Sequence, residues 1–365
     1  MNRFIMLYSK VWIKGSVLSL VSFIVSWLIL EGVSGMLLRL KENASKSSAQ
    51  FTAKENKSSE TKNTLVLIKN DALGILRLAP GPYNVSYVVK QTDSLDNAHT
   101  LPEKTVSITY HIDSLSRRIT PFDSSRAVGK YALFLGCSFT YGESVADSST
   151  LPYFFGKDTG YRPYNYGVSG YSPSHMLALQ QSVNMRNEVA EKNGIAIYTY
   201  IEDHLARVAP STKWIYNSKG YWPNVNPNTV TVEGTYAEKH PILLELIQGM
   251  YKSNIVNLFN VNFPRRYSTE QYERFVAIVK KSEELYRKQF GNDNFYVVIF
   301  PAYPMPAELR QLFEQAHLNV IDYSALFSWK ATYDGMHPDG DAYRRVAEKL
   351  AHDLPLAFPQ SGSTM

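Results

Sequence analysis

Residues 131–142 of this 365-residue chain read YALFLGCSFTYG, a run of apolar and aromatic residues that breaks at Gly136 and reaches Ser138 two positions later. A continuous apolar run of this length, ended by glycine, is typical of a central strand in a parallel sheet that is covered on both faces. In such sheets the functional side chains lie just beyond the carboxyl ends of the strands. The segment therefore predicts that Ser138 stands where a nucleophile would be presented.

A general base for this serine is available near the other end of the chain. A serine hydroxyl is a weak nucleophile at neutral pH and needs a base, which itself needs an orienting carboxylate. Residues 333–340 read YDGMHPDG, so Asp334 and His337 lie three residues apart in a turn-forming segment. The helical pattern of Asp341–Leu354 would anchor that loop. One ordered loop would then carry the base and its orienting group together.

The serine segment and the Asp-x-x-His segment resemble the SGNH (GDSL) hydrolases, a family of serine esterases and acyltransferases. The first block of that family is usually Gly-Asp-Ser followed by an aromatic residue and a glycine, and here Cys137 replaces the aspartate. The resemblance implies Ser138 as nucleophile, His337 as general base and Asp334 as its orienting group. Two alternatives remain at this point: Ser138 only caps the following helix, or Cys137 is the nucleophile. We expect Cys137 to be a small buried residue at the strand end.

A second block bears on the oxyanion hole. Residues 165–170 read NYGVSG, and the resemblance implies that Gly170 lends its backbone N–H to the developing oxyanion, together with the N–H of Ser138. Fixed donors in a preorganised loop stabilise such charge, and glycine lets the backbone approach closely. A glycine-rich turn between a strand and a helix is the structural alternative.

The third block of the family, Gly-x-Asn-Asp, is absent from its expected place. Residues 201–204 read IEDH there, so the asparagine that completes the family's oxyanion hole is missing. Asp203 and His204 are the candidates for its position, although an ionised carboxylate would repel an oxyanion. The alternative is a polar strand end whose side chains form structural hydrogen bonds.

Composition argues against several other classes of protein. The net charge is only +5 and the basic residues are scattered, which does not favour nucleic-acid binding. A single cysteine excludes an internal disulfide and a cysteine-rich metal site. No His-Glu-x-x-His motif is present. We expect no metal and no cofactor.

The N-terminal residues 1–41 have the composition of a membrane anchor. The stretch Gly15–Ser34 has the length of about 20 residues that crosses a bilayer. Glu31 is placed at the interface, because a carboxylate at the bilayer centre would cost on the order of 2.5–3.5 kcal/mol. We expect an uncleaved single-pass helix with the catalytic domain outside the cytoplasm. A cleaved signal peptide and a buried core helix are the alternatives.

The rest of the chain divides into three expected parts. Residues 42–63 are polar and predict a solvated linker. Residues 64–128 predict a small β-rich subdomain that packs on the catalytic domain. Its strands are expected at Thr64–Ile68, Val85–Lys90 and Thr105–Ile112.

Residues 129–358 alternate strand and helix patterns, which predicts a parallel sheet between two helical layers. The expected fold class is therefore α/β, a flavodoxin-like three-layer α/β/α sandwich with an N-terminal transmembrane helix and a β-rich extension. A long helix is expected at about Ser174–Lys192. Residues 205–265 interrupt the alternation and are read as an insertion with one short helix near Ile242–Tyr251.

The implied reaction is acyl transfer from an ester through an acyl-enzyme on Ser138. Water as acceptor makes an esterase, and a sugar hydroxyl makes an O-acyltransferase. The anchor and the aromatic-rich insertion favour acetyl esters of carbohydrates at or outside the membrane as substrates. The alternatives are a lipase or lysophospholipase, and a catalytically inactive SGNH-fold module for binding or assembly at the membrane. No protein partner is predicted.

Overall fold

The computed structural model describes residues 2–47, 67–70, 72–89 and 104–354. Its centre is a five-stranded sheet in the order β11-β10-β7-β5-β6, in which all neighbouring strands are parallel. Taken in chain order, this is the 2-1-3-4-5 arrangement of flavodoxin-like folds. The strands are β5 (Lys130–Leu135), β6 (Arg162–Asn165), β7 (Asn193–Tyr200), β10 (Phe295–Ile299) and β11 (Asn319–Asp322). The predicted α/β class with a central parallel sheet is confirmed.

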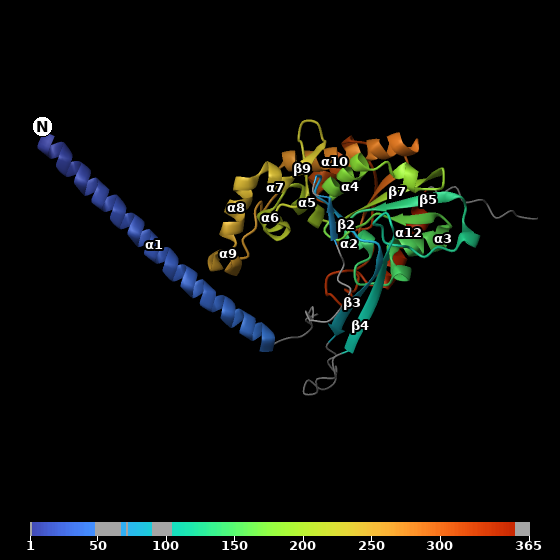
Figure 1. Ribbon diagram of the computed structural model, residues 1–365, viewed down its shortest axis with the longest axis horizontal. Helices are drawn as coiled ribbons and strands as arrows, with labels where there is room; N and C mark the ends of the chain where they lie inside the picture. Colours follow the sequence, from blue (N-terminus) through green and yellow to red (C-terminus); the bar gives the residue numbers. More distant parts are fainter. Residues whose placement is uncertain (1, 48–66, 71, 90–103, 355–365) are drawn as a thin grey trace, which may run out of the picture.

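Helices cover both faces of the sheet (Figure 1). Successive residues of a strand point to opposite faces, so Leu133 and Leu135 join one core cluster while Ala132 and Phe134 join the other. The first cluster includes side chains of α4 (Pro173–Ser182), α10 (Thr269–Phe290) and α11 (Ala307–Gln315), and the second those of α3 (Leu151–Thr159) and α12 (Gly340–Asp353). The central strands are apolar along their length because both of their faces are buried.

The N-terminal helix α1 runs from Asn2 to Ser47 and extends from the globular part as a long rod (Figure 1). Within it, Ser19–Lys41 is long and apolar enough to cross a membrane. A signal sequence near an N-terminus meets the same criterion. The helix continues into the predicted linker of residues 42–63, and residues 48–63 lie outside the described part of the chain.

Two antiparallel pairs make up the β-rich extension. Strand β1 (Leu67–Asn70) pairs with β2 (Ile75–Leu78), and β3 (Gly81–Val89) pairs with β4 (Lys104–Ile112). The strand β2 was not among the sequence predictions. Its four residues include the charged Arg77, and so short a segment carries little periodic signal.

The expected helix at Ser174–Lys192 is shorter than predicted. Helix α4 ends at Ser182, where the next residue, Val183, is extended. The side chain of Asn184 then accepts a hydrogen bond from the N–H of Arg186 and begins a separate 3₁₀ turn, Met185–Glu188. Asparagine competes with the helix in this way because its side chain binds nearby backbone groups.

The insertion contains more structure than the single predicted helix. Its elements are α5 (Asp203–Val208), α6 (Thr212–Ser218), β8 (Pro223–Val225), β9 (Val232–Thr235), α7 (Tyr236–Lys239), α8 (Pro241–Met250) and α9 (Asn254–Leu258). Side-chain caps from Ser211, Thr235 and Ser253 start α6, α7 and α9. Their apolar faces share a small core of their own, which includes Ile215 and Trp222. Such short helices depend on shared packing because none is stable alone.

Substitution of one glycine in the central sheet is expected to destabilise the fold. A Cβ on Gly194 would lie 2.1 Å from the carbonyl oxygen of Tyr131 on the neighbouring strand. We expect Gly194→Ala to lower the free energy of unfolding by about 1–3 kcal/mol, since a packed sheet absorbs extra volume poorly. Gly249→Ala is the control, because open space surrounds that position and alanine is the better helix former. Equal denaturation midpoints for the two variants in detergent solution would contradict the prediction.

Candidate active site

Ser138, His337 and Asp334 lie in one line at the carboxyl edge of the sheet. Ser138 opens the short helix α2 (Ser138–Tyr141), which follows β5 directly. Its Oγ is 2.8 Å from Nε2 of His337, and Nδ1 of the same ring is 2.5 Å from Oδ2 of Asp334. Residues 199 positions apart in the chain are therefore in hydrogen-bonding contact. This chain of contacts has the geometry of a nucleophile, a base and an orienting carboxylate.

The loop before α12 is held in shape by hydrogen bonds to the side chain of Asp334. Oδ1 of Asp334 accepts hydrogen bonds from the backbone N–H groups of Met336 at 2.8 Å and His337 at 3.0 Å. Gly335 takes a positive φ of 72°, which glycine adopts at no steric cost. The N–H of Thr332 donates to the carbonyl of His337 at 2.7 Å and completes the turn. The ring of His337 is thus held by the backbone around it.

Asp334 is ionised in this setting. Burial opposes its charge, but hydrogen bonds from His337, from Ser144 and from backbone N–H groups outweigh that cost and hold the pKa of Asp334 well below its usual range. The Ser144 hydroxyl donates to Oδ2 of Asp334 at 2.5 Å. A charged carboxylate at this point keeps the proton of the neutral imidazole on Nδ1, which leaves Nε2 free to accept from Ser138.

Ser144 is a site residue that the sequence analysis missed. It has a φ of 63°, and its Oγ lies 2.9 Å from the hydroxyl of Tyr87 on β3. Its backbone N–H donates to the hydroxyl of Tyr110 on β4 at 2.9 Å. No spacing rule could have marked it, because its carboxylate partner is 190 residues away. Through Ser144, the β3–β4 pair is connected by hydrogen bonds to the loop that carries Asp334 and His337.

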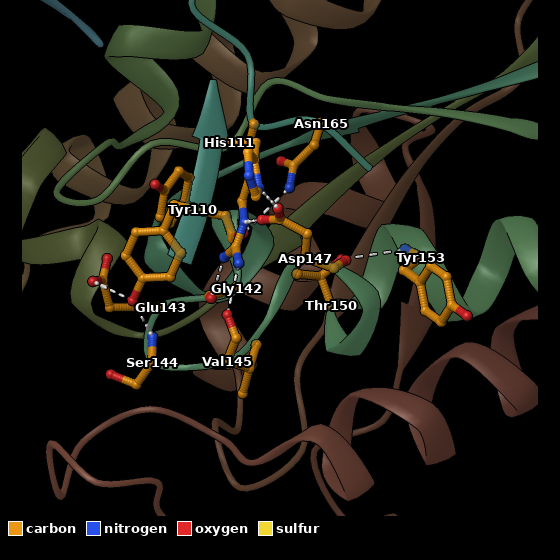
Figure 2. Close-up of polar contacts among 12 residues, drawn as sticks. Tyr110, His111, Gly142, Glu143, Ser144, Val145, Asp147, Thr150, Tyr153 and Asn165 are labelled. Atoms are coloured by element: carbon orange, nitrogen blue, oxygen red, sulfur yellow. Dashed lines mark hydrogen bonds and ion pairs between the residues drawn. The ribbon is translucent and has the colours of Figure 1, made fainter. Parts of the chain in front are cut away.

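A buried guanidinium supports the turn that carries Ser138. Arg118 is 2% exposed, and it donates to the carbonyl oxygens of Tyr141 at 3.0 Å, Gly142 at 2.5 Å and Val145 at 2.6 Å. Its Nε donates to Asp147 at 2.8 Å. Figure 2 shows Gly142, Val145 and Asp147 converging on one point beside Tyr110. The planar, five-donor guanidinium can satisfy several acceptors at once.

These residues border an open cleft of about 1060 Å³. Ser138, Gly170 and His337 line it at the carboxyl edge of the sheet, where ligands bind in α/β folds of this kind. Aromatic side chains form much of the wall, and the extension contributes to it. The cleft is also lined by Leu76, Leu78, Tyr87, Glu143, Asp203, Arg207, Tyr303, Trp329, Asp334 and Met336.

The two candidates from residues 201–204 have different positions. His204 is 0% exposed and is not among the residues that line the cleft. Its Nδ1 is 2.6 Å from the hydroxyl of Tyr198, and burial holds the pKa of His204 well below its usual value. The expectation that His204 could serve the oxyanion is therefore wrong: its backbone turns into α5 and places the ring in the core.

Asp203 does line the cleft, together with a residue that the sequence analysis missed. Arg207 follows one helical turn later, and its Nη2 is 3.9 Å from the Asp203 carboxylate. Nη1 of Arg207 donates to the carbonyl of Tyr171 at 2.5 Å, and the guanidinium lies 5.2 Å from the ring of Trp214. The spacing of four residues on a helix was the signal for this pair. Arg207 thus places a positive charge on the edge of the cleft that bears Gly170.

Among the residues that the structure describes, no group of three or more histidine, cysteine, aspartate or glutamate side chains could hold a metal ion. Gly170 has a φ of 84°, a conformation that favours glycine. Cys137 is fully buried beside the nucleophile candidate.

No family model matches the chain, and no curated protein matches it. Among solved structures the chain is similar to a lipolytic protein of the G-D-S-L family from Desulfitobacterium hafniense, with 11% identity over 62% of this chain and 99% of that one and a TM-score of 0.32. It is also similar to an acetyl xylan esterase from the rumen bacterium Butyrivibrio proteoclasticus (8% identity, 83% and 96% covered, TM-score 0.35). A family two carbohydrate esterase from Clostridium thermocellum, solved with cellohexaose, is a third (9% identity, 79% and 97% covered, TM-score 0.36).

The strand order, the serine after the first sheet strand and the Asp-x-x-His loop before the last helix agree with the resemblance to the SGNH (GDSL) hydrolases.

We expect Arg118→Met to lower the free energy of unfolding by about 3–5 kcal/mol, because it removes a buried charged donor from Oδ1 of Asp147 and from the carbonyl groups of Tyr141, Gly142 and Val145. Arg344→Met is the matched control, since Arg344 pairs with Asp341 and Glu348 on an exposed helix face and such pairs contribute about 0–1 kcal/mol. Denaturant unfolding of both variants checks this. An equally small loss for both would contradict a supporting role for Arg118.

Proposed function

We propose that the protein is an SGNH-type serine hydrolase or acyltransferase that acts on ester bonds through an acyl-enzyme on Ser138. The observation that carries the proposal is the unbroken contact from Ser138 through His337 to Asp334, at 2.8 Å and 2.5 Å, beside an open cleft. A serine that only capped a helix would need no imidazole at its hydroxyl. The low pKa of Asp334 keeps its carboxylate charged beside Nδ1 of His337, so that Nε2 can accept the proton of the Ser138 hydroxyl.

The proposed reaction has two halves. In the first, Nε2 of His337 takes the proton of the Ser138 hydroxyl as Oγ bonds to the ester carbonyl carbon, and the imidazolium then protonates the departing alcohol. In the second, Nε2 takes a proton from the acceptor hydroxyl as its oxygen attacks the acyl-enzyme, and the proton returns to Ser138. Asp334 stabilises the imidazolium in both halves and stays ionised.

The proposed oxyanion hole uses the backbone N–H groups of Ser138 and Gly170. Developing charge on the carbonyl oxygen is stabilised best by donors that are already in place. Ser138 stands at the start of α2 and Gly170 borders the same cleft. Asp203 occupies the edge where the resemblance calls for an amide donor, and a carboxylate has no hydrogen to offer there. The nearby Arg207 supplies positive charge to that edge instead.

We propose acetyl esters of carbohydrates as the substrate class. The aromatic side chains of Tyr87, Tyr303 and Trp329 in the wall of the cleft offer apolar faces to sugar rings, and Glu143, Asp203 and Arg207 offer partners to sugar hydroxyls. The apolar helix α1 would hold this cleft at a membrane, with the catalytic domain outside the cytoplasm. Water or a second sugar hydroxyl would be the acceptor. Leu76, Leu78 and Met336 at the cleft favour the second candidate, a lipase-type esterase.

Covalent labelling with a fluorophosphonate tests the nucleophile. We expect the full chain in detergent to be labelled at Ser138, and Ser138→Ala to abolish the label and to lower kcat by a factor on the order of 10⁴–10⁶. Cys137→Ala is the matched control, because that neighbouring thiol is buried, and it should keep both label and turnover. Mass spectrometry locates the adduct.

The substrate is then tested by acetate release from acetylated oligosaccharides beside release of long-chain acids from p-nitrophenyl esters. Acetate release that depends on Ser138 supports the proposed substrate class. Release of long acyl chains alone would assign a lipase-type activity. A folded chain that neither labels nor turns over, yet binds acetylated glycans, would be an inactive binding module and would contradict the proposed enzyme.

The altered third block gives a separate prediction. Asp203→Asn places an amide donor at the cleft edge, so we expect kcat/KM to rise by about 10-fold or more, toward the 10²–10³ that one oxyanion donor contributes. Asp203→Ala adds no donor and is the control, and we expect it to give no such rise in kcat/KM. If Asp203→Asn and Asp203→Ala both reduce the rate, the carboxylate itself serves the reaction.

A further inference from the structure

An apolar surface lies on the outside of the insertion. Helix α8 and the segment after α9 expose large apolar side chains: Ile242 (77%), Leu243 (44%), Leu246 (66%), Phe259 (70%) and Phe263 (50%). The opposite side of the same elements is packed, since Ile247 and Tyr251 belong to the small core of the insertion. A soluble surface helix would place polar residues on the outer face. Contiguous exposed apolar surface marks a place of contact with another apolar phase.

This surface adjoins the apolar helix α1. Helix α9 packs against α1 (Figure 1) along one face of the span, at positions spaced i, i+3, i+4 and i+7, namely Glu31, Ser34, Gly35 and Leu38. Ser34 is 5% exposed, and a Cβ on Gly35 would lie 2.9 Å from Nδ2 of Asn254. Small residues at these two positions let the helices approach closely.

Hydrogen bonds to the Glu31 carboxylate stabilise the contact between α1 and α9. It accepts hydrogen bonds from the Ser253 hydroxyl at 2.8 Å, from the N–H of Asn254, and from the N–H of Ile255 at 3.4 Å. The carboxylate thus meets the first backbone donors of α9, which have no partner within their own helix. A charge that would be costly inside hydrocarbon has its partners where the domain meets the span.

The level of this contact along α1 follows from the sequence. Residues 15–30 carry no charge, and at a rise of 1.5 Å per residue they cover about 24 Å, most of a hydrocarbon core. Large side chains of that segment, such as Phe23 (67%) and Leu28 (63%), are not covered by the rest of the chain. Glu31 is the next residue along and lies near the end of the predicted span Gly15–Ser34, although the apolar character of α1 continues to Leu40. Helix α9 therefore meets α1 toward the C-terminal end of its apolar segment.

Basic residues border the apolar surface. Lys252, Arg265 and Arg266 are exposed on the same stretch of chain, and the Arg265 guanidinium lies 5.9 Å from the ring of Phe263. Aromatic and basic side chains together are typical of segments at the membrane–water interface. Each lysine or arginine near an anionic bilayer contributes about 1 kcal/mol of attraction.

We propose that the outer face of α8 and of the segment after α9 (Ile242, Leu243, Leu246, Phe259 and Phe263) is a bilayer-docking surface that lies in the anionic headgroup region beside the membrane span of α1. This inference rests on the proposed membrane anchor. It gives the chain two attachments to the same leaflet, a span and an interfacial surface joined by Glu31. Two attachments restrict rotation about the span, whereas a single helix would leave the domain free to turn.

The docked surface also sets the position of the cleft. Trp214 of α6, which shares the small core of the insertion, lies 3.9 Å from the Cβ position of Gly170 and stacks on Arg207. The insertion is therefore packed against the glycine edge of the candidate active site. Holding α8 and α9 in the interface holds that edge close to the membrane surface, where esters attached to surface components would be found.

Depth-dependent quenching in bilayers tests the docking surface. The full chain is reconstituted into vesicles of phosphatidylcholine and phosphatidylglycerol, with an environment-sensitive fluorophore on single added cysteines and doxyl-labelled lipids as quencher. Ile242→Cys and Phe259→Cys report on the proposed surface, Val25→Cys reports on the span, and Lys157→Cys on α3 is the water control. The natural Cys137 is buried and stays in place.

We expect labels at 25, 242 and 259 to be quenched severalfold more than the label at 157, with shallow quenchers most effective at 242 and 259. Quenching at 25 without quenching at 242 and 259 would overturn the docking surface and leave the anchor intact. A label at 25 that lipids do not quench would overturn the anchor and with it this inference. Burial of the labels at 242 and 259 without lipid quenching would mean a protein partner or a second copy, which also overturns it.

The Glu31 joint is tested in the same vesicles. We expect Glu31→Ala to reduce the quenching of the label at 259 while the label at 25 is unaffected, because the span stays and the contact with α9 is lost. Circular dichroism and the denaturation midpoint report that each variant is folded, independently of docking and of the proposed nucleophile. Unchanged quenching at 259 in Glu31→Ala would overturn the role of the carboxylate.

Discussion

Parallel strands deliver the segments that follow them to a single edge of the sheet, and this constraint assembles the candidate active site. Ser138 follows β5, Gly170 lies in the segment after β6, and Asp203 and Arg207 follow β7. Between β5 and β7 the strand order reverses direction, which is where ligand clefts form in doubly wound sheets. Residues that share no local sequence relation become neighbours because their strands are hydrogen-bonded in register.

The cost of burying charge then decides how that edge is supported. The Arg118 guanidinium and the Asp334 carboxylate are both largely removed from water, so each must be surrounded by partners. Arg118 donates hydrogen bonds to the carbonyl groups that end the α2 turn. Asp334 accepts hydrogen bonds from the backbone of its own loop and from the hydroxyl of Ser144. Through these groups the β-rich extension becomes part of the site rather than an appendage, because Tyr87 and Tyr110 reach Ser144.

The same principle operates at the other end of the molecule. Glu31 interrupts an otherwise apolar helix, and its carboxylate is matched by a hydroxyl and backbone donors at the start of α9. The polar groups of the joint are thereby satisfied without water, while the apolar residues of α8 and Phe259 remain on the outside. The carboxylate that the sequence places at the membrane interface is thus a residue through which α1 contacts the globular part.

Local patterns were sufficient for some of these features. The apolar run before Gly136 identified the first sheet strand, and the alternation of strand and helix patterns identified the α/β class. The segments at 131–142 and 333–340 marked Ser138, Asp334 and His337, because each carries its information within a few residues. The tertiary structure alone decided the rest. Whether His204 faces the cleft or the core, and whether Arg118, Ser144 and Arg207 serve the site, depends on partners far away in the chain. Burial and long-range hydrogen bonding are properties of the packed chain, and no periodicity in the sequence encodes them.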